Sequence, residues 1–306
     1  MTSLKCQNAI KHEIERSDHF QTEKSSNREY VPSAEASNDK FIRKCPGCSA
    51  TLDLTWPSQY CCRSCMYNDT LYNDTSPDEV PPAPTAAPPT IIHSYWRSSS
   101  SWRVRIALAL KKVDYDYKAV HLVKNEQMAD DYVALNPSQE VPALEIDGLV
   151  LTQSLAIIEY LDETRPDVGP RLLPSADAAD RAKVRMLSDM IAHAIQPVQN
   201  LRCLRKLIAW HEDKDVKAQK KVEWGRWAID LGFEALEKAL SKTAGKYCFG
   251  DTVTMADLCL VPQVYNANRF ECDMSKFPTI QRINDELVQL AAFQAAAPDK
   301  MPDAVL

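Results

Sequence analysis

WRSSSSWRVRIALALK, the stretch from Trp96 to Lys111, decides the fold of this chain. Four consecutive serines, residues 98–101, precede a segment with the repeat of one helix face. That face comprises Val104, Ala107, Leu108 and Lys111. Because Ile91 to Tyr95 is β-branched and aromatic, we expect a strand, a serine turn and a helix in succession. The first turn of a helix has unpaired N–H groups and a partial positive charge, so the serine run indicates a place for an anion such as a thiolate.

The serine run also has two simpler interpretations. Serine is among the preferred N-cap residues, so the run is compatible with a cap that has no chemical role. A serine hydrolase would need a G-x-S-x-G elbow, which does not surround these serines, and His93 lies within the preceding strand. A functional interpretation therefore depends on the motifs that accompany the run.

Residues 98–111 resemble the motif SSCx(W/H)RVRIALALK of the zeta class of cytosolic glutathione transferases, with Ser100 in place of the family cysteine. The resemblance extends from about Ile92 to about Pro302. It implies an α+β fold with a thioredoxin-like N-terminal domain, residues 90–170, and an all-α C-terminal domain, residues 171–306. It also implies a homodimer.

The patterning of the chain agrees with this division. We expect strands at 115–121, 143–146 and 149–151, a polar helix at 125–135 and a hairpin turn at Asp147-Gly148. Further helices are expected at 177–195, 201–210, 216–242 and 255–266. Thr254 and Asp257 have the spacing of a capping box, to which we assign a folding role.

The resemblance implies a glutathione site. Ser98 is the expected hydroxyl donor to the thiolate, supported by Ser99 and Ser100. The other expected glutathione contacts are Val141, Pro142 (a cis-proline in the family), Gln153, Ser154 and Gln196. Taken alone, Pro142 is also compatible with a strand start, and Ser154 with an N-cap.

Two arginines are candidates for a small acidic substrate. Arg97 adjoins the serine turn, and Arg269 matches a family arginine that holds a substrate carboxylate, a task that suits a guanidinium. For Arg269 a surface salt bridge is the alternative.

The implied reaction is the glutathione-dependent cis-trans isomerisation of maleylacetoacetate to fumarylacetoacetate in tyrosine and phenylalanine catabolism. A thiolate adds to the double bond, the resulting single bond rotates, and the thiolate leaves. Because glutathione supplies the nucleophile, we expect the isomerase activity to be retained although Ser100 replaces the family cysteine. Two alternatives remain open: a general transferase that conjugates or dehalogenates small electrophiles, and a non-catalytic scaffold.

The N-terminal part predicts a separate small domain. Residues 1–44 are polar and predict a disordered leader, and residues 67–89 form a proline-rich linker. Between them, residues 45–66 contain two C-x-x-C motifs typical of a zinc ribbon, with a strand at 51–56. Its expected ligands are Cys45, Cys48, Cys62 and Cys65, with Cys61 as an alternative to Cys62. Incidental free cysteines, or a redox pair at the first motif, are the other interpretations.

The composition favours a cytoplasmic protein. A net charge of −6 with 25% charged residues gives no reason to expect nucleic acid. The sequence shows no signal peptide and no stretch long enough for a membrane span. We therefore expect the ten cysteines to be thiols or metal ligands.

Overall fold

The computed structural model describes residues 43–44, 51–52, 88–174 and 176–305. The chain divides into two compact units, residues 1–83 and 84–306. In the first unit, strand β1 (Arg43–Lys44) pairs antiparallel with β2 (Thr51–Leu52). The remainder of the expected strand at 51–56 and all the expected zinc ligands lie outside the described residues.

The second unit begins with a four-stranded sheet in the order β4-β3-β5-β6. β3 (Ile91–Ser94) is parallel to β4 (Asp116–Ala119) and antiparallel to β5 (Ala143–Ile146), which pairs antiparallel with β6 (Leu149–Thr152). A parallel pair needs a crossover connection, and helix α3 between β3 and β4 provides it. The sheet thus has the βαβ and ββα halves of the expected thioredoxin-like domain.

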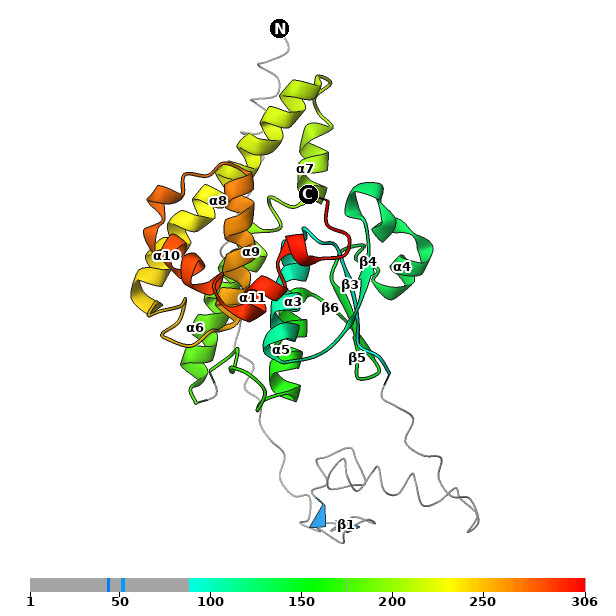
Figure 1. Ribbon diagram of the computed structural model, residues 1–306, viewed down its shortest axis with the longest axis vertical. Coiled ribbons are helices and arrows are strands. Elements are labelled where there is room, and N and C mark those ends of the chain that lie inside the picture. Colours follow the sequence, from blue (N-terminus) through cyan, green and yellow to red (C-terminus); the bar gives the residue numbers. More distant parts are fainter. Residues whose placement is uncertain (1–42, 45–50, 53–87, 175, 306) are drawn as a thin grey trace, which may run out of the picture. The chain divides into compact units, whose positions relative to one another are not determined.

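The register places Ile92 of β3 opposite Tyr117 of β4 and Leu144 of β5. Ile92 and Leu144 are fully buried beneath α3 (Ser99–Leu110) and α5 (Ser154–Thr164). Figure 1 shows these two helices on one face of the sheet and α4 on the other. A short turn after β3 leads to the N-terminus of α3, which therefore lies close to the end of this central strand.

The expected single helix at 125–135 is wrong. The segment forms three short pieces, η1 (Leu122–Lys124), η2 (Glu126–Met128) and α4 (Asp130–Leu135). Asn125 has a left-handed backbone (φ 64°) and Ala129 is extended (ψ 145°), so a continuous helix is interrupted at both places.

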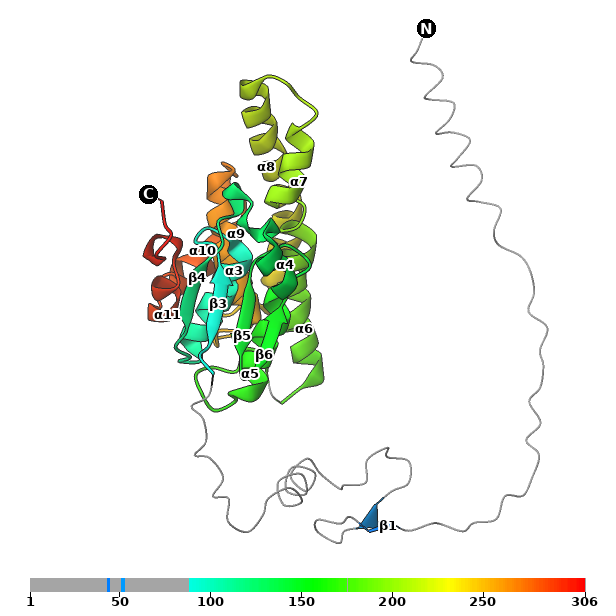
Figure 2. The ribbon, with the colours of Figure 1, turned by 90° about the vertical axis from the view of Figure 1, so that its right-hand side faces the viewer.

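The rest of the unit is helical, as expected. Its elements are α6 (Ala178–Asp189), η3 (Met190–Ile195, π-helical), α7 (Leu201–Ile208), α8 (Lys214–Thr243), α9 (Met255–Arg269), η4 (Met274–Lys276), α10 (Pro278–Leu287), α11 (Ala291–Ala295) and η5 (Pro298–Lys300). In both ribbon views the α7–α8 hairpin projects beyond the other helices (Figures 1 and 2). None of the described helices is both long and apolar enough to cross a membrane.

Helix α9 lies at the centre of this unit and packs against α3. Its capping box is confirmed: Asp257 accepts hydrogen bonds from the backbone N–H of Thr254 (2.7 Å) and of Cys248 (2.9 Å). Burial raises the pKa of Asp257 although these N–H donors favour its charged form. The contact between α3 and α9 joins the sheet to the helices, and the serine turn lies at that junction.

Candidate active site

The serine turn is a helix cap whose hydroxyl is also available to a ligand. Ser98 is the N-cap of α3, and its Oγ accepts a hydrogen bond from the backbone N–H of Ser101 at 3.2 Å. Because the oxygen accepts in this bond, the hydroxyl hydrogen remains free to donate. Ser99 is buried, and Ser100 is partly exposed. Capping and thiolate stabilisation are thus compatible in one residue.

The segment before the turn is held by contacts from distant parts of the chain. Buried Arg105 donates to Ser94 Oγ (3.1 Å), to the carbonyl of Trp96 (3.0 Å) and to the carbonyl of Ala296 (3.1 Å). Asp303 accepts from the backbone N–H of Trp96 at 3.1 Å. These bonds hold the turn in place from beneath and from the C-terminal end of the chain.

A cavity of about 690 Å³ opens over the turn. Among the expected site residues it brings together Arg97, Ser98, Ser99, Ser100, Val141, Gln196 and Arg269. Pro142, Gln153 and Ser154 are not on its lining. The cavity therefore unites the serine turn with the expected substrate arginines, while the expected γ-glutamyl contacts lie outside it.

Those other positions have local geometry that fits a peptide ligand. The Val141–Pro142 peptide bond is cis. Gln153 is exposed with φ of 68°, a strained conformation of the kind that concentrates at ligand sites. Ser154 begins α5, and its Oγ accepts a hydrogen bond from buried Arg103 at 3.3 Å. Burial lowers the pKa of Arg103, whose Nε and second terminal nitrogen have no hydrogen-bond partner among the residues that the structure describes.

This set of groups fits glutathione. The N-terminus of α3 and Ser98 suit a thiolate, the backbone of Val141 suits a peptide group, and the N-terminus of α5 suits a carboxylate. Arg103 lies behind Ser154 and adds positive charge at that end. Thiol, peptide and carboxylate groups together are what glutathione offers.

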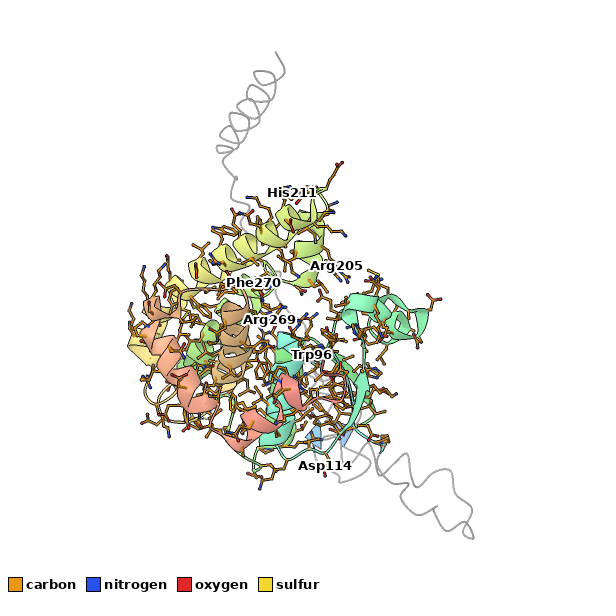
Figure 3. All side chains as sticks on the ribbon, turned by 45° about the horizontal axis from the view of Figure 1, so that its top comes forward. Trp96, Asp114, Arg205, His211, Arg269 and Phe270 are labelled. Atoms are coloured by element: carbon orange, nitrogen blue, oxygen red, sulfur yellow. The ribbon has the colours of Figure 1, made fainter. Side chains whose placement is uncertain are left out.

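The opposite side of the cavity is cationic. Figure 3 shows Arg269 at the end of α9 and Arg205 on α7 around the region of Trp96. Arg269 donates to Asn266 Oδ1 at 3.1 Å and contacts the ring of Phe270 at 5.7 Å. Burial and then the charge of Arg97 lower the pKa of Arg269. For Arg269, the expected alternative of a surface salt bridge has no partner carboxylate among the described residues.

Sequence reasoning missed several lining residues from the α7–α8 hairpin. Lys221 and Arg205 line the cavity, as does Gln199 just before α7. The only available signal was the basic character of the segments around 202–206 and 217–221. Such runs are typical of solvated helix faces, so the signal did not point to a site.

No cluster of metal-ligating side chains occurs within the described ranges. The expected zinc ligands fall outside those ranges.

Comparison with known proteins agrees with this architecture. The chain matches the family models for the glutathione S-transferase N-terminal domain over residues 88–163 and C-terminal domain over residues 203–294. Maleylacetoacetate isomerase of Mus musculus is 53% identical over 215 residues, which are 70% of this chain and 94% of that protein.

Two solved structures are also similar. A bacterial zeta-class maleyl pyruvate isomerase shares 43% identity with a TM-score of 0.66, covering 70% of this chain and 100% of its own. A maleylacetoacetate isomerase from Anaeromyxobacter dehalogenans 2CP-1, with glutathione bound in its active site, shares 44% identity with a TM-score of 0.62, covering 71% and 98%. This chain therefore belongs to the glutathione S-transferase family, in the zeta class that contains the maleylacetoacetate isomerases.

Proposed function

We propose that this chain isomerises maleylacetoacetate to fumarylacetoacetate with glutathione as cofactor. The observation that carries the proposal is that one cavity is lined by both Ser98 and Arg269. The first suits a thiolate, and the second suits the carboxylate of an acidic substrate. The similarity to named isomerases supports the same reaction.

Glutathione, when bound, supplies the thiolate that adds to the cis double bond and leaves after rotation. Ser98 donates a hydrogen bond toward the sulfur, and the α3 N-terminus adds its partial positive charge, so both favour the ionised form. Val141, Gln153 and Ser154 would hold the peptide and carboxylate groups. Gln196 lines the same cavity.

Two arginines would bind the substrate. Arg97 lies over the ring of Trp96 at 5.2 Å, on the cavity lining beside the serine turn. Together with Arg269 it would orient a carboxylate while the central bond of the substrate rotates. A fixed carboxylate leaves the rest of a small molecule room to turn within about 690 Å³.

Ser100 lines the cavity where the family motif has a cysteine. Its hydroxyl is far less acidic than a thiol, so it contributes a hydrogen-bonding group rather than a second thiolate. Because the nucleophile comes from glutathione, the reaction retains its essential group.

The proposal extends to the rest of the molecule. We assign residues 90–170 to glutathione binding and 171–306 to substrate selection, in a homodimer, with a zinc ribbon at 45–66. A cytoplasmic setting is supported by the described cysteines, since Cys203, Cys248, Cys259 and Cys272 are free thiols.

The test is the glutathione-dependent isomerisation of maleylacetone by the purified chain and by Ser98→Gly. Glycine retains most N-cap stability, with a cost of only about a few tenths of a kcal/mol, but lacks the hydroxyl. We expect kcat/KM to fall about 100-fold, as for loss of one preorganised donor.

Ser98→Ala is the companion variant, because it lacks both the hydroxyl and the cap. It should be as inactive as Ser98→Gly but less stable by about 1 kcal/mol. Full activity in the glycine variant would remove Ser98 from the mechanism, and an inactive parent chain would refute the isomerase assignment.

A further inference from the structure

The cavity is strongly cationic although the chain as a whole has a net charge of −6. Its cationic side chains are Arg97, Arg202, Arg205, Lys206, Lys221 and Arg269. Among the described lining residues the only carboxylate is Glu140, whose Oε1 lies 3.7 Å from Arg202. Positive charge concentrated on one concave surface of an acidic protein indicates an anionic ligand.

Some of these cations already have protein partners. Arg205 donates to Asn125 Oδ1 at 2.7 Å and to the carbonyl of Leu122 at 2.9 Å, which ties α7 to the segment before η2. Arg202 donates to the carbonyl of Ser138 at 2.7 Å and lies near Glu140. These two arginines therefore have structural tasks that explain their positions.

Lys221 of α8 differs from them. It is partly buried on the cavity lining, and within the described residues its ammonium group forms neither an ion pair nor a hydrogen bond. Burial lowers the pKa of Lys221, and the positive charges of Arg269 and Arg97 lower it further. A desolvated cation beside other cations is unfavourable unless a ligand supplies the missing negative charge.

Arg269 faces the same difficulty from another helix. Its side chain is more exposed than that of Lys221, but its partly buried hydrogen bond is to Asn266, a neutral partner rather than a carboxylate. Lys221 and Arg269 line the same cavity, neither pairs with a carboxylate in the described part of the chain, and their like charges repel. A monoanion would neutralise one of them, whereas a dianion would neutralise both.

We propose that Lys221 forms a second carboxylate subsite, so that the site selects substrates with a carboxylate at each end, one bound by Arg269 and the other by Lys221. This inference rests on the proposed function and deepens it to a substrate class. Lys221 is a specificity-determining residue: it binds the distal end of the substrate and takes no part in the bond changes. Maleylacetoacetate has two carboxylates, and maleylacetone is the same molecule without the distal one.

The experiment compares these two substrates in the parent chain and in Lys221→Met, which keeps the apolar stem and removes the charge. We expect KM for maleylacetoacetate to rise about tenfold or more, the effect of one lost charged hydrogen bond, while KM for maleylacetone changes less than about twofold. Lys221→Arg should restore discrimination between the substrates.

Lys220→Met is the matched control. Lys220 precedes Lys221 on α8, pairs with Glu223 at 2.8 Å and is absent from the cavity lining. It therefore tests whether a general change in net charge is sufficient. Equal losses for both substrates in Lys221→Met, or the same discrimination loss in Lys220→Met, would overturn the subsite.

A binding measurement separates this inference from the proposed function. Calorimetry with octanedioate and with heptanoate, which lacks one carboxylate, needs no turnover. Lys221→Met should weaken the binding of octanedioate about tenfold and leave the affinity for heptanoate unchanged. If the parent chain fails to isomerise maleylacetone yet shows this pattern, the proposed function fails and the dicarboxylate subsite stands. Equal binding of octanedioate to both proteins would refute the subsite.

Discussion

Lys111 and Lys221 are two lysines withdrawn from water in opposite ways. Lys111, at the end of α3, is fully buried, and its ammonium group donates to Asp162 Oδ1 at 2.7 Å and to the carbonyls of Pro170 (2.9 Å) and Arg165 (3.3 Å). Lys221, on the cavity lining, has other cations for neighbours and no carboxylate among the described residues. Complete satisfaction of a buried charge indicates a structural role, and an unsatisfied one indicates a ligand site.

The acidic partner of Lys111 shows how complete this satisfaction is. Asp162 also accepts hydrogen bonds from the backbone N–H groups of Leu172 (2.9 Å) and Leu173 (3.2 Å). Burial acts to raise its pKa, but the bonds from Lys111 and from these two N–H groups prevail, so the pKa of Asp162 is lowered. The cluster thereby attaches the connection between the sheet and the helices to α3 and α5.

The largest expected effect comes from Lys111→Met. It leaves the buried carboxylate of Asp162 with Arg171, whose Nε lies 3.3 Å away on a partly exposed side chain, as its remaining cation, so the free energy of unfolding should fall by about 3 kcal/mol, the lower end for a broken buried pair. Urea denaturation measures it. Arg165→Met, which breaks the exposed pair with Asp147, serves as the comparison and should cost less than about 1 kcal/mol. Equal effects at the two sites would show that the buried cluster has no special role.

The next effect concerns acid. Because the folded-state pKa of Asp162 lies below the unfolded value of about 3.9, its contribution is present above that pH and is lost as pH falls through the folded-state pKa. The stability difference between the parent chain and Asp162→Asn should therefore be constant near neutrality and narrow below about pH 4. Urea midpoints across this range measure it, and a difference independent of pH would contradict the assignment.

The smallest effect sharpens the contrast. Lys221→Met removes a cation that has no partner, so the stability of the ligand-free chain should stay within about 0.5 kcal/mol or increase slightly as repulsion is relieved. Thermal and urea unfolding beside Lys111→Met measure it under the same conditions. A loss comparable to that of Lys111→Met would mean that Lys221 has a structural role, which the dicarboxylate subsite does not allow.

Some parts of the site could be predicted from the sequence and others could not. The place of Ser98 at a helix N-terminus followed from the local sequence, and that of Val141 before a cis-proline followed from the family resemblance. The helix at 125–135 was predicted wrongly because Asn125 adopts a left-handed backbone that no periodicity reveals. Contacts between distant segments were still harder to predict from the sequence. Arg103 donates to Ser154 across 51 positions, and Arg205 donates to the carbonyl of Leu122 across 83.

By itself, the sequence determined the thioredoxin-like and helical halves, the serine turn at the start of α3, the capping box of α9 and the family. Each of these follows from hydrophobic periodicity, from capping residues or from a continuous motif, and all three signals lie within short stretches of sequence. Only the tertiary structure decided that Lys111 pairs with Asp162, whereas Lys221 has no partner carboxylate among the described residues. Helical periodicity tells which residues share a face, but the charge that faces them comes from chain segments that folding brings near.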